Sequence, residues 1–300
     1  MTGSLILQSL INSLLLGSLY GLLAIGYSVV YGILQFINFA HSNVFMLAAY
    51  VPIVLASWRA LPWPLAFIVT ILVIAAVGAL VDTLAFRPLR KRKAPKLSNL
   101  ASAIGVSFFL ENAMLLVFGG APKGFPAPAI FRQSYQVAGT WLPSVAIYNI
   151  PITLISLFVL YQIINRTKVG LAMRALSEDI EVAGLMGIET NKVIAAAFAL
   201  GSGLAAVAAI MWFSRLTMAT PFMGSVPGTK AFVAAVLGGV GNLPGALLGG
   251  LILGFGEITF VTLFPALSAY RDIVAFTALI LVLLVKPRGL LGAAVHEEKL

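Results

Sequence analysis

The sequence predicts an all-α polytopic membrane protein in which residues 1–300 form a single transmembrane domain. Hydrophobic residues make up 60% of the chain and charged residues only 10%, whereas a soluble domain contains roughly 45–50% and 25%. Several uncharged segments of about 20 residues follow one another, and a helix of that length crosses a hydrocarbon core of roughly 30 Å. We therefore expect about eight spanning helices, together with broken or half helices.

Basic residues are concentrated in three segments of the chain. The 19 Lys and Arg residues give a formal net charge of +9, and 13 of them lie in residues 87–96, 165–192 and 286–300. This clustering is the positive-inside pattern, which places the three segments in the cytoplasm. We expect a multi-pass protein of the plasma (inner) membrane, surrounded by lipid and without a nucleic-acid partner. The chain has no cysteine, so disulfides and thiolate chemistry are excluded.

Residues 5–31 are predicted to form the first span. Gly17, Gly21 and Ala24 place small side chains on one face of it, which permits close contact with another helix. The apolar run then continues, but a polar cluster interrupts it. Polar groups at membrane depth are costly unless they face protein or a wet cavity. The cluster consists of Asn38, His41, Ser42 and Asn43.

Two further spans flank the first basic segment. Residues 63–86 are predicted to span the membrane and to end at 87–96, which holds six basic residues and no acidic one. Asp82 is expected at the cytoplasmic interface near this end. Residues 97–118 then cross back. The next segment, 119–146, contains four prolines and few charges, so it is predicted to be an external loop.

The second half of the chain again alternates spans with polar segments. Residues 147–164 are predicted to return to the cytoplasm, 193–213 to cross again, and 214–230 to be external. Residues 269–285 form the last predicted span. A cytoplasmic C-terminus then requires an odd number of crossings after Lys230, so one of the intervening pieces must belong to a broken span.

That break is predicted within the apolar run 231–260. A first piece of about ten residues stops at Gly238, while Asn242 is a favourable N-cap for a second helix and Pro244 suits its first turn. Glycine recurs at every fourth position, which allows close approach to neighbouring backbone. These residues are Gly241, Gly245 and Gly249, and also Gly250 and Gly254. The interruptions at 38–43 and 238–245 indicate a substrate path between two pseudo-equivalent halves of the chain.

The polar segment 165–192 is predicted to contain two short amphipathic helices. In the first, Val169, Met173 or Ala172, and Leu176 lie at helical spacing. Ser177 is a candidate cap for the second, whose first turn is acidic. Four apolar residues are expected to be exposed together there, which favours a docking surface for a partner over an ordinary solvated loop. They are Ile180, Val182, Leu185 and Met186.

Several runs resemble the permeases of branched-chain amino-acid ABC importers, the LivH-like type. They are GLAMRALSEDIEVAGLMGIETNKVIAAAFALGSGLAAVAA, SLYGLLAIGYSVVYGILQFINFAH, KAFVAAVLGGVGNLPGALLGGLILG and ILVLLVKPRGLLG. The resemblance covers most of the chain and is weakest at 119–146. It implies three kinds of partner: a second permease, two cytoplasmic ATPases, and an extracytoplasmic (periplasmic) solute-binding protein.

The resemblance also implies that 165–192 couples the membrane helices to the ATPases. The residues that match the family's loop are Arg174, Glu178, Asp179, Gly184, Gly187 and Ile188. The chain has no G-x-x-x-x-G-K-[ST] motif, so ATP and Mg²⁺ are expected on the partner ATPases and not here. We expect a passive gate that is not an enzyme, has no catalytic residue and needs no cofactor of its own.

Polar residues within the spans are candidates for the translocation path. Ser42 and Asn43 stand where many relatives of this type carry a glycine and an acid, which puts a charge-based role there in doubt. The lone His41 predicts no metal site. In the structural alternative, the same groups contact no solute and only provide hydrogen-bond partners at helix breaks or between helices. The candidates are Asn38, His41, Asn43, Glu111, Asn242 and Glu257.

The sequence thus predicts a permease subunit that moves branched-chain or other neutral, hydrophobic amino acids inward. A permease of the same family for urea, short amides or sugars is the nearest alternative. A stand-alone solute channel, with constrictions at 38–43 and 238–245, is a second alternative from another class. A secondary transporter is a third, disfavoured because charged pairs along the spans are scarce.

Overall fold

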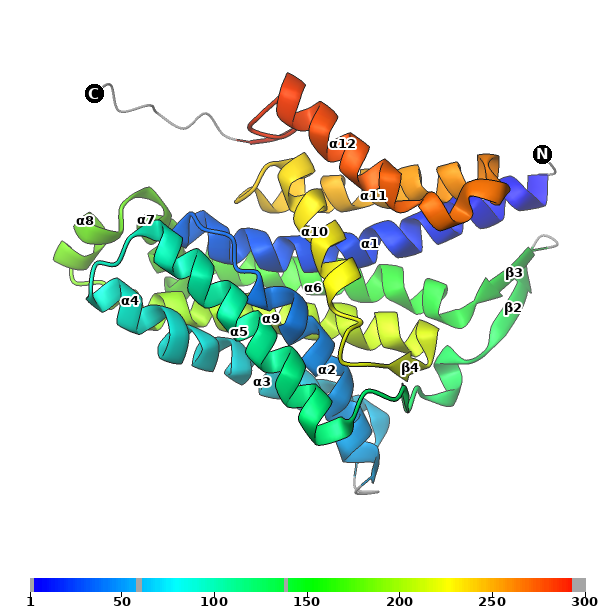
Figure 1. Cartoon of the computed structure of the whole chain (residues 1–300), viewed down its shortest axis with the longest axis horizontal. Helices are drawn as coiled ribbons and strands as arrows, with labels where there is room; N and C mark the ends of the chain where they lie inside the picture. Colours follow the sequence, from blue (N-terminus) through cyan, green and yellow to red (C-terminus); the bar gives the residue numbers. More distant parts are fainter. Residues whose placement is uncertain (1–2, 58–60, 138–139, 293–300) are drawn as a thin grey trace.

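Seven helices long and apolar enough to cross a membrane dominate the computed structural model, which describes residues 3–57, 61–137 and 140–292. Two shorter apolar helices accompany them (Figure 1). This confirms an all-α polytopic membrane protein. The long helices are α1 (Gly3–Leu34), α2 (Ala40–Ser57), α3 (Trp63–Val81), α5 (Lys96–Phe118), α6 (Ser144–Arg166), α9 (Thr190–Leu216) and α11 (Leu243–Leu263); the short ones are α10 (Ser225–Gly238) and α12 (Asp272–Val285).

Helix α1 is the central element of the bundle and packs most closely against α11. A helix that is apolar on every side is stable only when it is surrounded, and α1 is almost wholly buried from Leu15 onward. Glycines bring the two backbones together, because a Cβ built on Gly254 would lie 2.4 Å from Gly17 Cα and one on Gly250 2.5 Å from Gly21 Cα. The small-residue face predicted from the sequence is therefore confirmed.

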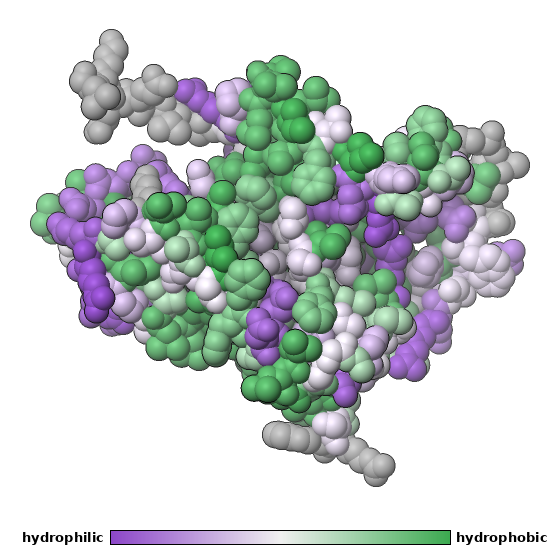
Figure 2. Space-filling view, viewed as in Figure 1, coloured by the Kyte–Doolittle hydropathy of each residue, from purple (hydrophilic) through white to green (hydrophobic). Residues whose placement is uncertain are grey.

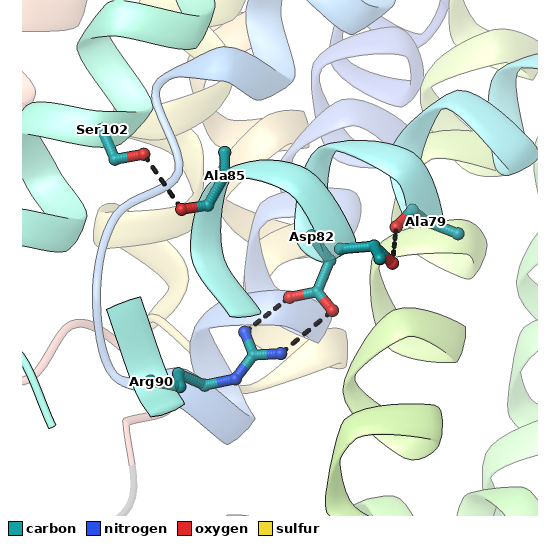
Figure 3. A network of polar contacts seen from close by, with 6 residues as sticks. Ala79, Asp82, Ala85, Arg90 and Ser102 are labelled. Atoms are coloured by element: carbon teal, nitrogen blue, oxygen red, sulfur yellow. Dashed lines mark hydrogen bonds and ion pairs between the residues drawn. The ribbon is translucent and has the colours of Figure 1, made fainter. Parts of the chain in front are cut away.

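Helix α3 continues through a π-helical turn, η1 (Asp82–Phe86), into α4 (Arg87–Lys91). The Asp82 side chain is fully buried, and the guanidinium of Arg90 donates to both of its oxygens, Nη1 to Oδ1 at 2.5 Å and Nη2 to Oδ2 at 3.0 Å (Figure 3). Asp82, predicted as an interfacial residue near the cytoplasmic end, is thus buried among the protein's own helices, where Arg90 of the basic segment neutralises its carboxylate.

The segment predicted as an external loop carries short strands. The hairpin of β2 (Ser134–Val137) and β3 (Thr140–Pro143) pairs Ser134 with Pro143 and Val137 with Thr140. Strand β1 (Lys123–Gly124) pairs with β4 (Met218–Ala219), which joins this segment to the end of α9. A short 3₁₀ turn, η2 (Ala129–Phe131), lies between β1 and β2. The turn is held by ring contacts, since Trp63 meets both Phe125 and Phe131 edge to face.

Two helix boundaries in the second half differ from the sequence expectation. Helix α10 begins at Ser225, so Lys230 lies inside a helix and is buried, whereas it was expected at the end of an external segment. The last predicted span, expected from 269, begins at Asp272 after the 3₁₀ turn η3 (Pro265–Tyr270). At 1.5 Å per residue the 14 residues of α12 extend about 21 Å, less than a hydrocarbon core.

The basic segments gather toward one end of the bundle (Figure 1). Helix α4 and the short helices α7 (Lys168–Glu178) and α8 (Ile180–Leu185) lie at the end opposite to the start of α1. Residues 289–291, after α12, contact the break between α10 and α11, which approaches the end of α1. The hairpin β2–β3 lies at the other end, beside the start of α1. Segments far apart in sequence therefore share the arrangement that a positive-inside distribution requires.

Candidate functional site

Two capped helices, α7 and α8, lie within residues 165–192, which the sequence predicts to couple the protein to ATPases and which we call the coupling segment. Thr167 caps α7, because the Gly170 N–H donates to its Oγ1 at 3.1 Å. Asp179 caps α8, accepting on Oδ1 from the backbone N–H groups of Glu181 (2.7 Å) and Val182 (2.9 Å). The prediction that Ser177 caps the second helix is wrong: α7 continues through Glu178, and the Ser177 hydroxyl donates to the Arg174 carbonyl inside it.

Helix α7 is fixed to the end of α6. A Cβ built on Gly170 would stand 2.1 Å from the Ile164 carbonyl oxygen, so only glycine allows this approach. Arg174 Nη1 donates to the same carbonyl. Met173 and Leu176 are buried on this side, whereas Val169, expected on the same face, is exposed. A displacement of α7 must therefore move α6 with it.

Helix α8 ends in a Schellman motif that projects its tip away from the bundle. Gly187 has φ +87°, its N–H donates to the Gly184 carbonyl, and the Ile188 N–H donates to the Ala183 carbonyl. The Leu185 and Met186 side chains just before this turn are 87% and 80% exposed. The turn therefore presents apolar side chains to the surroundings instead of folding them against α9.

Acidic residues lie next to that apolar tip. Glu178, Asp179 and Glu181 are exposed, as are Gly184 and Gly187. Val182 is exposed as predicted, but Ile180 is half-buried and packs against the core, so the expected surface of four apolar residues consists of three. Of the six residues predicted to form the coupling loop, Arg174 holds the segment to α6 and Ile188 packs inward, while the other four lie on its free surface.

The first membrane interruption is a short turn between α1 and α2. Gln35 adopts φ +51° after the last turn of α1, and Asn38 caps α2 by accepting from the Ala40 N–H at 3.2 Å. His41 is buried edge-on to Tyr27, with ring centroids 4.6 Å apart. Asn43 Nδ2 donates to the carbonyl (2.7 Å) and the hydroxyl (2.8 Å) of Ser107 on α5. These polar groups therefore join helices to one another.

The second interruption lies between α10 and α11, as predicted. Asn242 caps α11 by accepting from the Gly245 N–H at 2.8 Å. Its Nδ2 also donates to the Leu291 carbonyl at 2.7 Å, and the N–H groups of Leu290 and Leu291 donate to the carbonyls of Leu237 and Gly238. The last described residues of the chain thus supply partners that the end of α10 lacks.

The two interruptions do not face each other directly. The first turn of α2 instead meets the first turns of α10: a Cβ built on Gly228 would lie 2.1 Å from Ser42 Cβ, and one on Gly224 2.5 Å from the Ser42 carbonyl oxygen. The break at 238–245 approaches the end of α1, where a Cβ on Gly32 would lie 3.8 Å from Gly241 Cα. The first turns of α2 and α10 are therefore in contact with each other.

Glu257 belongs to a buried charged cluster. Lys230 Nζ lies 2.8 Å from Glu257 Oε1 and 2.7 Å from Asp272 Oδ1, and Tyr20 OH donates to Glu257 Oε2 at 3.3 Å. The ammonium also lies 5.8 Å from the centre of the Tyr20 ring. Sequence reasoning missed Lys230 and Asp272. The sequence feature that indicated a basic partner was Glu257 itself, because a carboxylate inside an apolar span requires an opposite charge nearby.

Glu111 lies apart from this cluster. It is half-buried on α5, which packs mainly against α2, and no ion pair joins it to another residue in the ranges described. The six candidate path residues therefore occupy four places: the turn before α2 together with its first turn, the break before α11, the interior of α5, and the interior of α11. Only Glu257 among them takes part in a charged network.

Comparisons with known proteins give a consistent result. Residues 9–283 match the family described as "Branched-chain amino acid transport system / permease component". The chain is 41% identical to the high-affinity branched-chain amino acid transport system permease protein BraD of Pseudomonas aeruginosa and 38% identical to LivH of Escherichia coli, in both cases with 97% of each chain covered. The ribose import permease protein RbsC of Escherichia coli is 30% identical over 59% of this chain and 51% of its own length. No solved structure matches the chain.

Proposed function

Because the chain belongs to the family of permease components of branched-chain amino acid transport systems, we propose that it moves branched-chain or other neutral, hydrophobic amino acids inward as one subunit of an ATP-driven importer. The single observation that carries this proposal is the match over nearly the whole length of permeases named for that transport. The bundle of seven long apolar helices supplies the membrane part.

We propose an assembly with a second permease, two cytoplasmic ATPases and an extracytoplasmic solute-binding protein. The coupling segment suits contact with an ATPase, because its apolar tip and acidic residues are exposed while α7 is tied to α6. Movement of the ATPases would push the segment as a unit and so displace α6 and α9, which it joins. ATP and Mg²⁺ would be bound by the ATPases.

The test is reconstitution of this chain into liposomes with and without those partners. The complete assembly is expected to take up leucine only when ATP is present, and the chain alone is expected to pass no solute. A chain that conducts solutes by itself would contradict the proposal and support the channel alternative. Uptake of ribose but not leucine by the complete assembly would favour the sugar permease. The partial similarity to RbsC supports that alternative.

The coupling segment and the C-terminal segment are proposed to face the cytoplasm. Because the chain has no cysteine, single substitutions can report its orientation without further changes. Leu185→Cys, at the exposed tip of α8, is expected to react with a membrane-impermeant maleimide only in inside-out vesicles. Arg132→Cys, in the exposed loop after η2, is expected to react only in right-side-out vesicles. The reverse pattern would invert the proposed topology.

A further inference from the structure

Four charged residues form a cluster that joins α10, α11 and the start of α12. Lys230 bridges Glu257 and Asp272, and Arg271 Nε lies 3.8 Å from Asp272 Oδ1. Each acidic residue of the cluster thus has a basic partner in it, and each basic residue an acidic one. Arg215, near the end of α9, interacts electrostatically with Arg271 and adds a further positive charge beside the cluster.

The cluster has a buried half and an open half. The side chains of Lys230 and Glu257 are 4% and 1% exposed, whereas those of Arg271 and Asp272 are 56% and 48% exposed. Both ion pairs of Asp272 among the described residues use Oδ1, which leaves Oδ2 for another donor. Figure 2 shows hydrophilic residues on this face below the start of α12, with mostly hydrophobic residues to their left and further hydrophilic residues toward the right of the view.

The cluster meets α1 about midway along that helix. Tyr20, which donates to Glu257, stands 17 residues after Gly3 and 14 before Leu34, so about 26 Å and about 21 Å of helix lie on either side of it. Glu257 itself lies inside the apolar helix α11, whereas Asp272 stands at the start of the short helix α12 and is half exposed. An ionisable residue in the interior of an apolar span, such as Glu257, is by default a candidate for a functional role.

We propose that Asp272 and Arg271 receive the ammonium and carboxylate groups of the transported amino acid, while Lys230 and Glu257 hold Asp272 in place. This rests on the proposed function. A zwitterion can exchange partners with this pair without changing the net charge of the site. A monocarboxylate or an amine would pair with only one of the two side chains and leave the other charge without a partner, which is costly once the bound solute excludes water from it. The cluster therefore selects solutes that carry both charges. Lys230 and Glu257 are positioning residues.

The test compares Asp272→Asn and Arg271→Gln with the wild type in liposomes that contain the complete assembly. Two quantities are measured: leucine uptake, and ATP hydrolysis stimulated by the leucine-loaded binding protein. Each variant is expected to lower uptake about tenfold or more, as loss of a charge-assisted hydrogen bond does, while stimulated hydrolysis stays within about twofold of wild type. Asp272→Glu and Arg271→Lys, which retain the charges, are expected to recover part of the uptake.

A matched control is Arg132→Gln, which removes an exposed charge from the loop after η2, far along the chain from this cluster. It is expected to leave both quantities unchanged. Unchanged uptake by Asp272→Asn and Arg271→Gln would overturn the inference, and so would a parallel loss of uptake, hydrolysis and assembled complex, because that pattern indicates a structural joint. Absence of ATP-driven leucine uptake by the wild type would instead contradict the proposed function itself.

Discussion

Replacing Glu178 and Asp179 together by lysine is expected to reduce ATP-driven uptake by at least about tenfold while the subunit remains in the membrane. Both carboxylates are exposed at the free end of the coupling segment. Reversing two charges at a docking surface places like charges opposite each other, and truncating or reversing close interfacial pairs typically costs roughly 2–5 kcal/mol. Uptake and co-purification of the ATPases with the variant are the two measurements.

The structure adds a control to this experiment, because Asp179 also caps α8. Losing a cap costs about 1 kcal/mol of helix stability whatever the partner does. Asp179→Ser retains a capping oxygen without the charge, so it separates the two effects. Glu189→Lys, in the exposed pair with Lys192 on the same segment, serves as a charge-reversal control away from α8. Normal uptake by the double lysine variant would show that these acids are merely solvated.

Lys230→Met is expected to destabilise the subunit by about 3–5 kcal/mol, the usual cost of removing one partner from a buried ion pair. The side chains of Lys230 and Glu257 are nearly inaccessible, so the variant leaves an uncompensated carboxylate between α10 and α11. The midpoint of thermal unfolding of the purified subunit in detergent should fall accordingly. A midpoint equal to that of the wild type would mean that Glu257 is already neutral.

The double variant Lys230→Met with Glu257→Gln separates charge from packing. Glutamine keeps the shape of the side chain and an oxygen that can accept from Tyr20, so most of the lost stability should return. If the double variant is as unstable as Lys230→Met alone, the loss comes from the packing of the lysine stem and not from the unpaired charge. Thr229→Ala, one residue earlier and exposed, is the control substitution within α10.

Local chemistry explains which features could be predicted from the sequence. The break before α11 was predicted correctly, because Gly238, Asn242 and Pro244 each act on their own backbone. The cap of α8 was misplaced by two residues for the same reason: Ser177 and Asp179 are both good capping residues. Which one caps depends on where α7 ends, and α7 is held in place by contacts with α6 that a short window of sequence does not contain.

The charged groups inside the bundle could be predicted only in part. An isolated glutamate in an apolar span indicates that a partner exists, but Lys230 reaches Glu257 only because α10 begins as early as Ser225 and packs against α1 and α11. Asp82 finds Arg90 through a π-helical turn that the sequence does not mark. These pairs are set by helix packing, which one sequence without its fold does not specify. The resemblance identified the transport class from whole runs of residues instead.

The contact of residues 290 and 291 with the break between α10 and α11 affects how the protein is made. Those residues provide the hydrogen-bond partners for Leu237 and Gly238 and accept from Asn242. A nascent chain emerges from its N-terminus onward, so α1 to α9 can pack while the ribosome is still adding α10 to α12. The break can be completed only after Leu290 and Leu291 have left the ribosome. Its closure therefore follows the synthesis of α10, α11 and α12.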